Sequence, residues 1–315
     1  MAVVEQEVIV RQLRWEADGV VSLELRSRAG DPLPPWDPGA HVDLVLPTGI
    51  ERQYSLCGPL ADRSCYRIGI RREHRSRGGS EYVHAFLRPG QRLRIKGPRN
   101  NFGFRRAGSY LFIAGGIGIT PILPMVRQAD AWGVDWTLLY GGHTDASMPF
   151  RDELRNHGGR VRFYPADKVG RIPLAEALEE VRPGREVYAC GPEPLIAGLR
   201  EAAAHWPDGT VHFERFKSRA RASTTEDTPF DVVCAASGKT VTVPPGRSII
   251  TALDEAGVAT ASSCRSGICG SCETRVLDGV PEHRDEILGE ADRAAGDRMF
   301  ICVSRAHTPN LTLDL

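Results

Sequence analysis

The sequence predicts three domains: an antiparallel β-barrel, a doubly wound parallel α/β domain and a small α+β domain. Short runs rich in β-branched residues fill residues 1–105, strands and helices alternate over residues 106–225, and a hairpin, a helix and further strands make up residues 226–315. A length of 315 residues suits two or three domains, and 41% hydrophobic residues suffice to give each a core.

The first domain is predicted from short strands separated by turns. QEVIVRQLRW, GVVSLELRS and HVDLVLP have the partly alternating pattern of half-buried strands, and YRIGIRR and QRLRIKGP add two more. Many short strands at this spacing are typical of an antiparallel barrel. One helix is expected in SEYVHAFL, with Ser80 as its N-cap.

The second domain is predicted from an alternation of apolar strands and helices. SYLFIAGGIGITPILPMVRQA contains a strand, a glycine-rich turn and a helix, and DWTLLYGG, RVRFYP, EVYACGP and GTVHFERF are further strands. RIPLAEALEEV and EPLIAGLREAAAHW are expected to be helices between them, so the sheet should be parallel. The polar segment SRARASTTEDTP that follows is expected to be an exposed linker.

The third domain opens on FDVVCAASGKTVTVP, a hairpin pattern with Ser-Gly at the turn. SIITALDEAGV is expected to be a helix. MFICVS and LTLDL are expected to be strands near the end of the chain.

Four cysteines of the third domain have metal-ligand spacing. Cys264, Cys269, Cys272 and Cys302 read C-x4-C-x2-C with a fourth cysteine thirty positions on, as in plant-type [2Fe–2S] proteins. Two irons bridged by sulfide need four thiolates, and the intervening glycines allow the loop to curl around the cluster. A zinc site or plain core cysteines are the alternatives, although zinc knuckles favour paired C-x2-C units and only one is present.

Composition excludes several classes. No run of eighteen apolar residues is present to span a membrane, and the first fifteen residues lack the architecture of a signal peptide. The remaining cysteines are scattered, which favours reduced thiols and a cytoplasmic location. Residues 226–315 hold 14 acidic and 8 basic side chains, a balance of −6, so the rest of this neutral chain carries +6. Basic runs interleaved with aromatic residues are absent, so nucleic acid is not an expected partner.

Five motifs in order give the chain a resemblance to the phthalate dioxygenase reductase family, which includes vanillate demethylase reductases. The likeness covers nearly all 315 residues, and it implies flavin, nicotinamide and β-grasp ferredoxin domains in that order. The motifs are Arg52-Gln53-Tyr54-Ser55, Gly78-Gly79-Ser80, Gly115-Gly116-Ile117-Gly118-Ile119-Thr120-Pro121, Cys190-Gly191-Pro192 and the four cysteines.

The resemblance implies that the flavin is FMN. Arg52, Tyr54 and Ser55 match the strand that lines it, and Ile70 and Arg71 match further contacts. A guanidinium offers a fork of donors for phosphate. Gly78, Gly79 and Ser80 open a helix, whose N-terminus can bind phosphate through free N–H groups, although a plain turn has the same pattern.

The resemblance also implies a nicotinamide site. Gly115, Gly116 and Gly118 lie between a strand and a helix, where backbone N–H groups can approach a pyrophosphate. Thr120 matches a residue that faces the flavin or nicotinamide, and Phe216 matches an aromatic near the flavin. In Cys190-Gly191-Pro192 the cysteine matches one near the nicotinamide ring, although a lone cysteine in an apolar strand is more often core.

One departure from the related domains bears on the choice of nicotinamide cofactor. Many of them carry a basic residue after the strand that corresponds to residues 138–142, and this chain has His143-Thr144-Asp145 there. Asp145 would repel a 2′-phosphate and could accept from a ribose hydroxyl, which favours NADH over NADPH. The alternative is that Asp145 is an ordinary loop acid.

The function that the resemblance implies is electron relay from NADH through FMN and a [2Fe–2S] cluster to an oxygenase component. The expected partner is a Rieske non-haem iron oxygenase or O-demethylase, met by transient contact, with a cytochrome P450 as the alternative. A redox-sensing module without turnover is an alternative of another class. Nothing in the sequence requires more than a monomer.

Overall fold

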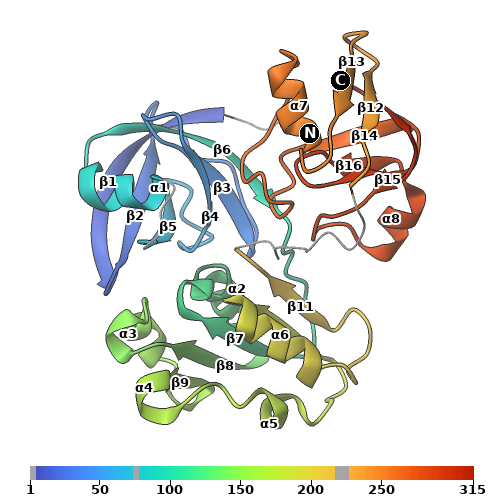
Figure 1. Cartoon of the computed structure of the whole chain (residues 1–315). Coiled ribbons are helices and arrows are strands. Elements are labelled where there is room, and N and C mark those ends of the chain that lie inside the picture. Colours follow the sequence, from blue (N-terminus) through green and yellow to red (C-terminus); the bar gives the residue numbers. More distant parts are fainter. Residues whose placement is uncertain (1–4, 74–77, 217–226) are drawn as a thin grey trace. The chain divides into compact units, whose positions relative to one another are not determined.

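The computed structural model describes residues 5–73, 78–216 and 227–315, and its contacts divide the chain into two compact units, Met1–Phe216 and Lys217–Leu315 (Figure 1). The first unit contains both an antiparallel and a parallel sheet. Residues 218–226 of the predicted linker lie outside the described residues, and the exact boundaries of three domains stay a prediction. Over the described ranges, no helix has the length and apolarity to cross a membrane.

Six strands form the antiparallel sheet of the first unit, in the order β4-β3-β6-β1-β2-β5. An isolated antiparallel bridge between Leu56 and Ile68 joins the two outer strands, so the sheet closes into a barrel around an apolar core. The predicted barrel is confirmed. Its strands are β1 (Glu5–Ala17), β2 (Val20–Ser27), β3 (Ala40–Val45), β4 (Glu51–Ser55), β5 (Cys65–Arg71) and β6 (Arg92–Asn100).

The helix expected after the Gly-Gly pair is present as α1 (Gly79–Phe86). Its predicted N-cap is wrong. Gly78 caps the helix with a left-handed φ of 87°, a conformation that glycine adopts without steric cost. Ser80 lies one residue inside the helix, and its hydroxyl accepts a hydrogen bond from the backbone N–H of Glu73 at 3.1 Å instead.

Five strands form the parallel sheet of the first unit, in the order β11-β10-β7-β8-β9. The first of these strands in the chain, β7, lies between β8 and β10, so the order of connection reverses beside it. Ligands of doubly wound sheets bind at such a switch point, outside the carboxyl ends of the strands. The strands are β7 (Ser109–Gly115), β8 (Asp135–Gly142), β9 (Val161–Pro165), β10 (Arg185–Cys190) and β11 (Val211–Glu214).

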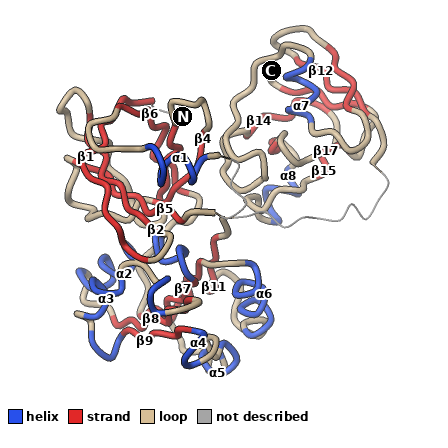
Figure 2. Tube along the Cα trace, turned by 60° about the vertical axis from the view of Figure 1, so that its left-hand side comes forward, coloured by secondary structure: helices blue, strands red, loops and turns tan. Residues whose placement is uncertain are grey.

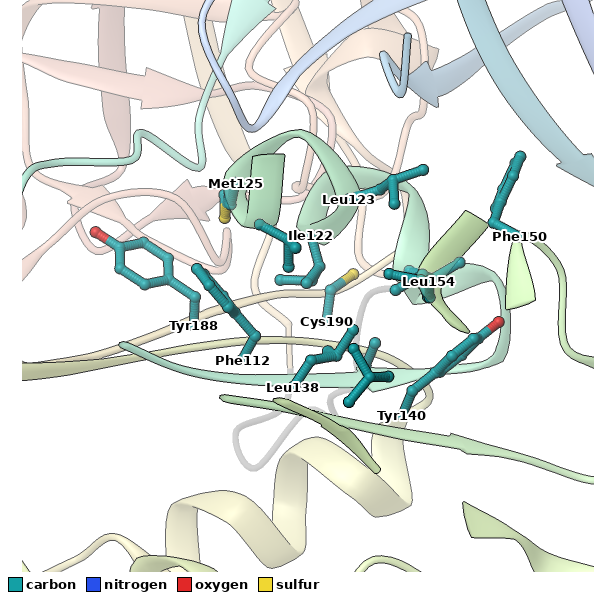
Figure 3. Packing of buried hydrophobic residues seen from close by; sticks show 14 of the residues in the cluster. Phe112, Ile122, Leu123, Met125, Leu138, Tyr140, Phe150, Leu154, Tyr188 and Cys190 are labelled. Carbon is teal, nitrogen blue, oxygen red and sulfur yellow. The ribbon is translucent and has the colours of Figure 1, made fainter. Parts of the chain in front are cut away.

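Helices cover both faces of this sheet. Phe112 and Tyr188 point toward α2 (Ile119–Ala131), where they pack with Ile122 and Met125 (Figure 3). The alternate residues Leu111 and Val187 face α6 (Glu193–Ala202). The predicted doubly wound fold is confirmed. The RIPLAEALEEV segment forms less helix than expected, a single short turn α5. The other helices here are α3 (Arg151–Arg155), α4 (Ala166–Val169), α5 (Leu174–Leu178), α6 (Glu193–Ala202) and the 3₁₀ turns η1 (Gly116–Gly118), η2 (Asp145–Ser147) and η3 (Gly158–Arg160).

The second unit is a mixed sheet packed against helix α7 (Ile249–Glu255), as a β-grasp fold requires (Figure 2). Its strand order is β13-β12-β18-β14-β16, with β12 and β18 parallel and the other pairs antiparallel. The predicted hairpin is confirmed, with Gly238 at φ 68° in its turn. The remaining elements are β12 (Phe230–Cys234), β13 (Thr240–Val243), β14 (Glu273–Asp278), β15 (Pro281–Glu282), α8 (Glu290–Ala295), β16 (Arg298–Phe300), β17 (Arg305–Ala306) and β18 (Asn310–Leu313).

Candidate cofactor sites

Two glycine turns meet at the switch point of the parallel sheet. A Cβ atom on Gly118 would lie 2.2 Å from the carbonyl oxygen of Cys190, and one on Gly191 would lie 3.2 Å from the Cα atom of Gly115. Any side chain at Gly118 would therefore force the turns apart. We call Gly115–Gly118 the nucleotide turn, and two of its residues, Gly115 and Gly116, line the cavity described next.

A cavity of about 610 Å³ opens at this edge. That volume lies within the range typical of small-molecule sites. Of the residues predicted for the nicotinamide site, Gly115, Gly116 and Pro192 line it. Other residues that line it had not been predicted: Gly141, Gly142, His143, Tyr164, Ala166, Arg171, Ile172, Leu174, Pro194, Leu195 and Gly198. Many of these follow the ends of β8 and β9, so the rule that parallel sheets bind ligands at their carboxyl edge could have found them.

Asp145 does not line this cavity. Its carboxylate accepts hydrogen bonds from Arg151 and, at 2.6 Å, from Lys168. The hydrogen bond from Lys168 is the main cause of a lowered pKa of the Asp145 carboxyl. In this geometry the charge of Asp145 neutralises two neighbouring cations, which is the loop-acid alternative, so its role in selecting NADH stays a prediction.

The residues predicted to hold a flavin come together on the barrel. We call Arg52, Tyr54 and Ser55 of β4, with Ile70 and Arg71 at the end of β5, the flavin wall. The side chain of Arg52 lies against the start of α1, because a Cβ atom on Gly79 would lie 2.7 Å from its Cγ atom. A guanidinium beside a helix N-terminus is a suitable pair of donors for a phosphate.

Ser55 provides the test of whether a further group fits this wall. Its hydroxyl is buried and has no hydrogen-bond partner within the described residues. Buried polar atoms are rarely left without a partner, so a polar atom of a bound flavin fits here. Burial raises the pKa of the phenol of Tyr54, the preceding residue of β4, so this ring is uncharged.

The flavin wall and the nucleotide turn meet where β5 contacts the start of α2. Thr120 is buried, and its hydroxyl donates to the carbonyl of Ile117 at 2.9 Å. A Cβ atom on Gly69 would lie 2.7 Å from the Cγ2 atom of Thr120, so the methyl group of Thr120 faces β5. Arg71 reaches across from the barrel and lines the nucleotide cavity.

Cys190 is fully buried at the end of β10, and burial raises the pKa of its thiol. Glu214 lies beside it on β11 in parallel register. The Oε2 atom of Glu214 is buried without a partner among the described residues, and burial raises the pKa of this carboxyl to about 8. Glu214 is not among the residues predicted from the sequence, although an acid at the end of the strand VHFE is an unusual residue for that place. Phe216 follows this strand and is 38% exposed.

The four predicted cluster ligands form two pairs. The thiols of Cys264 and Cys269 share a hydrogen bond that raises the pKa of Cys264 and lowers that of Cys269. The thiols of Cys272 and Cys302 share another, and Cys269 interacts electrostatically with both of them. Two adjoining pairs are the donor set that two irons require, one pair for each iron.

The backbone of the cysteine loop follows the predicted curl. Gly267 and Gly270 have φ angles of 71° and 76°, and Arg265 also has a positive φ of 52°. A Cβ atom on Gly267 would lie 2.7 Å from the side chain of Val303, so the loop passes close to the turn that carries the fourth cysteine. The N–H of Ser266 points at the sulfur of Cys264, with 3.3 Å between nitrogen and sulfur. These features fit a [2Fe–2S] cluster.

Comparisons with known proteins match family models to the cluster domain and to the nicotinamide domain. Residues 232–307 match the family model of a 2Fe-2S iron-sulfur cluster binding domain, which favours the cluster over zinc. Residues 112–201 match that of an oxidoreductase NAD-binding domain. The chain is 41% identical to the phenoxybenzoate dioxygenase subunit beta of Ectopseudomonas oleovorans, over 97% of this chain and 96% of that protein.

Solved structures extend the comparison to the fold. An intact type IV self-sufficient cytochrome P450 monooxygenase matches 99% of this chain with a TM-score of 0.91 and 42% identity, and the chain spans 41% of that longer protein. Phthalate dioxygenase reductase, described as a modular structure for electron transfer from pyridine nucleotides to [2Fe-2S], matches 99% of this chain and 98% of its own length, with a TM-score of 0.73 and 36% identity. The chain therefore belongs to the phthalate dioxygenase reductase family.

Proposed function

We infer that this chain is the reductase component of a multicomponent oxygenase and passes electrons from NADH through FMN and a [2Fe–2S] cluster to its partner. Flavin chemistry would convert the hydride of NADH into single electrons, and a [2Fe–2S] cluster would carry one electron at a time. One observation carries the inference. The strand that bears Ile70 and Arg71 touches the helix that begins at the nucleotide turn, within one compact unit.

The chain's own residues would bind and orient the cofactors. Arg52 and the N–H groups at the start of α1 would hold the FMN phosphate, and the free hydroxyl of Ser55 would bond a polar atom of the ring system. The nucleotide turn and Pro192 would bind the dinucleotide, with Cys190 buried behind them. The four cysteines would ligate the cluster in the two pairs described above.

We propose the division 1–105 for the flavin domain, 106–225 for the nicotinamide domain and 226–315 for the ferredoxin domain. The four cysteines outside the predicted cluster are buried free thiols, which supports a reducing compartment such as the cytoplasm; they are Cys57, Cys65, Cys190 and Cys234. The contact with the partner would be transient, and the chain would act as a monomer.

The partner is proposed to be a Rieske non-haem iron oxygenase or O-demethylase. This chain spans almost the whole length of relatives named phenoxybenzoate dioxygenase subunit beta and vanillate O-demethylase oxidoreductase. A cytochrome P450 is the second candidate, because the structure most similar in TM-score among those described above belongs to a P450 that contains the reductase in the same polypeptide.

Anaerobic titration of the purified protein with NADH tests the proposal. The flavin absorbance should bleach, and a rhombic paramagnetic signal of a reduced [2Fe–2S] cluster should follow. The iron-to-flavin ratio, measured with the flavin type, should be two irons per FMN. Zinc in place of iron, or a flavin that NADH does not reduce, would contradict the proposal. Substrate oxidation reconstituted with a Rieske oxygenase or with a P450 then distinguishes the two partners.

A further inference from the structure

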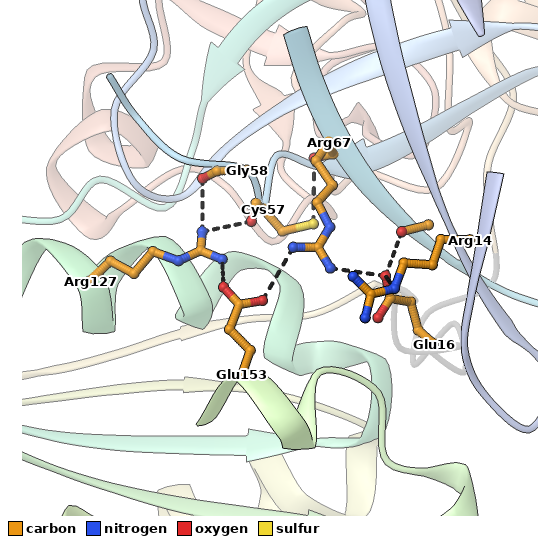
Figure 4. A network of polar contacts seen from close by, with 8 residues as sticks. Arg14, Glu16, Cys57, Gly58, Arg67, Arg127 and Glu153 are labelled. Atoms are coloured by element: carbon orange, nitrogen blue, oxygen red, sulfur yellow. Dashed lines mark hydrogen bonds and ion pairs between the residues drawn. The ribbon is translucent and has the colours of Figure 1, made fainter. Parts of the chain in front are cut away.

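A network of charged side chains joins the barrel to the parallel-sheet part of the first unit (Figure 4). Glu153 of α3 accepts hydrogen bonds from Arg127 of α2 and, at 3.2 Å, from Arg67 of β5. Arg67 also donates to Glu16 of β1 at 2.9 Å. The guanidinium of Arg67 lies 4.6 Å from the centre of the Phe150 ring. The carboxylate of Glu153 is thus shared between Arg127 of the parallel-sheet part and Arg67 of the barrel.

Arg127 makes a second connection through its other terminal nitrogen. Its Nη1 atom donates to the carbonyl oxygens of Cys57 at 2.8 Å and Gly58 at 2.9 Å, in the segment that leaves β4. One guanidinium therefore fixes two backbone carbonyls of the barrel and a carboxylate at once. The planar fork of donors on arginine suits this arrangement, whereas lysine is a single point charge.

The network is more buried than an ordinary surface ion pair, although its members differ. The side chains of Glu16 and Arg67 are 5% and 15% exposed, and those of Arg127 and Glu153 are 25% and 36% exposed. Burial opposes the ionisation of Glu153, yet the charges of Arg127 and Arg67 outweigh it and hold the pKa of this carboxyl below its usual value. Arg155 and Asp152, on the same helix, form a pair whose side chains are 58% and 87% exposed. Exposed pairs of that kind contribute little to stability.

The position of the network along α2 indicates what it does. Thr120, which touches Gly69, and Arg127 are seven residues apart on this helix, so they lie two turns apart on one face. Two attachment points separated by about 10 Å fix the direction of a helix as well as its position. The nucleotide turn is the direct continuation of this helix at its N-terminal end.

The two attachment points of α2 contact barrel residues that lie next to the flavin wall in the sequence. Cys57 and Gly58 follow Ser55 by two and three residues, and Gly69 directly precedes Ile70. We propose that Arg67, Arg127 and Glu153 form an interdomain clamp that positions the nucleotide turn against the flavin wall for hydride transfer. These three are positioning residues, because they act through Ser55, Ile70 and the nucleotide turn. The proposal rests on the function proposed above.

The test compares Arg127→Gln and Glu153→Gln with the wild-type holoprotein and with Arg155→Gln as the matched control on the exposed pair. In anaerobic single turnover with NADH, both clamp variants should reduce the flavin about 10- to 100-fold more slowly, since a misplacement of about 1 Å can cost a factor of that size. The dissociation constant for NAD⁺ should change less than about threefold. Arg127→Lys should recover only part of the rate. Arg155→Gln should behave as wild type.

Two readouts separate positioning from plain stability. The long-wavelength charge-transfer absorbance between flavin and nicotinamide should weaken in the clamp variants. In the protein without nicotinamide, amide hydrogen exchange in residues 55–58 and 119–127 should become faster. Gly69→Ala provides an independent variant, since its Cβ atom would push against Thr120 and the Phe150 ring and should weaken the same absorbance.

Wild-type rates and an unchanged absorbance in Arg127→Gln and Gly69→Ala would overturn the clamp. So would a lower melting temperature with a normal rate of flavin reduction, which indicates a structural role alone. Failure of the proposed function is distinguishable from either outcome, because the wild-type flavin would then not be reduced by NADH.

Discussion

The cysteine loop of the second unit and the flavin–nicotinamide region of the first are built in opposite ways. Three of the four predicted cluster ligands lie within nine consecutive residues, and a single unit supplies them all. The flavin wall and the nucleotide turn instead combine segments from β4, β5, the end of β7 and η1, up to 66 positions apart between Arg52 and Gly118. The first site depends on local spacing, and the second depends on how two sheets are held together.

The largest expected effect follows from the separation of these sites. Cys269→Ser removes one member of the Cys264 pair, so the cluster should not assemble and electron transfer to cytochrome c should be lost. NADH-driven ferricyanide reduction should persist, because the flavin wall and nucleotide turn belong to the other unit. Iron content and the two acceptor assays measure this.

A folded Cys269→Ser variant that also loses ferricyanide reduction would contradict this independence. The flavin content of the variant is the control, since loss of flavin alone would explain a lost activity. Wild-type iron content in the variant would remove Cys269 from the ligand set.

The second prediction concerns a substitution in the nucleotide turn, which belongs to the flavin–nicotinamide region. Gly118→Ala places a Cβ atom 2.2 Å from the Cys190 carbonyl oxygen, which the backbone cannot accommodate without separating the two turns. We expect NADH binding to weaken about tenfold or more, a cost of about 1.4 kcal/mol or more, with the cluster signal unchanged. Titration with NAD⁺ measures the affinity.

Gly159→Ala is the matched control, because a Cβ atom there meets nothing within 4 Å. Its affinity for NAD⁺ should equal that of the wild type. Equal affinities in both glycine variants would show that the closeness of the turns does not matter for binding.

The difference between the two regions explains what could be predicted from the sequence. Cys264, Cys269, Cys272 and Cys302 were found because cluster chemistry fixes their spacing along the chain. Gly115 and Pro192 were found because motifs mark them. Arg171 and Tyr164 were not, because they reach the cavity only through the order of the parallel strands, which no local pattern specifies. Asp145 differs from these, since Arg151 and Lys168 pair with its carboxylate and its contact with the ribose stays a prediction.

Glu214 gives a smaller effect that depends on pH. Because the pKa of its carboxyl is raised from 4.5 to about 8 by burial, the folded state binds its proton more tightly than the unfolded state. Stability should therefore fall as pH rises from about 4.5 to 8, by up to about 1.4 kcal/mol per pH unit. Glu214→Gln cannot ionise, so it should abolish this slope.

Denaturant unfolding of both proteins at about pH 5, 6.5, 8 and 9 measures the difference. The free energy of unfolding of the variant should rise relative to that of the wild type with increasing pH. This difference should level off above about pH 8. A constant difference across this range would mean that Glu214 is already ionised in the folded protein.

The smallest expected effect concerns Asp145. The sequence predicts that this residue contacts the ribose of the dinucleotide, whereas the structure pairs it with two cations. Asp145 lies outside the residues that line the nucleotide cavity and is paired with Arg151 and Lys168. Asp145→Asn should therefore change the ratio of kcat/KM for NADH and NADPH less than about twofold, which is below 0.5 kcal/mol. A marked gain in NADPH use would instead mean that the carboxylate turns toward the ribose when the dinucleotide binds, and that the ion pairs with Arg151 and Lys168 break to allow it.

Arg171→Gln is the informative companion variant, because Arg171 does line the cavity. If a 2′-phosphate can reach this guanidinium, its loss should weaken NADPH binding more than NADH binding.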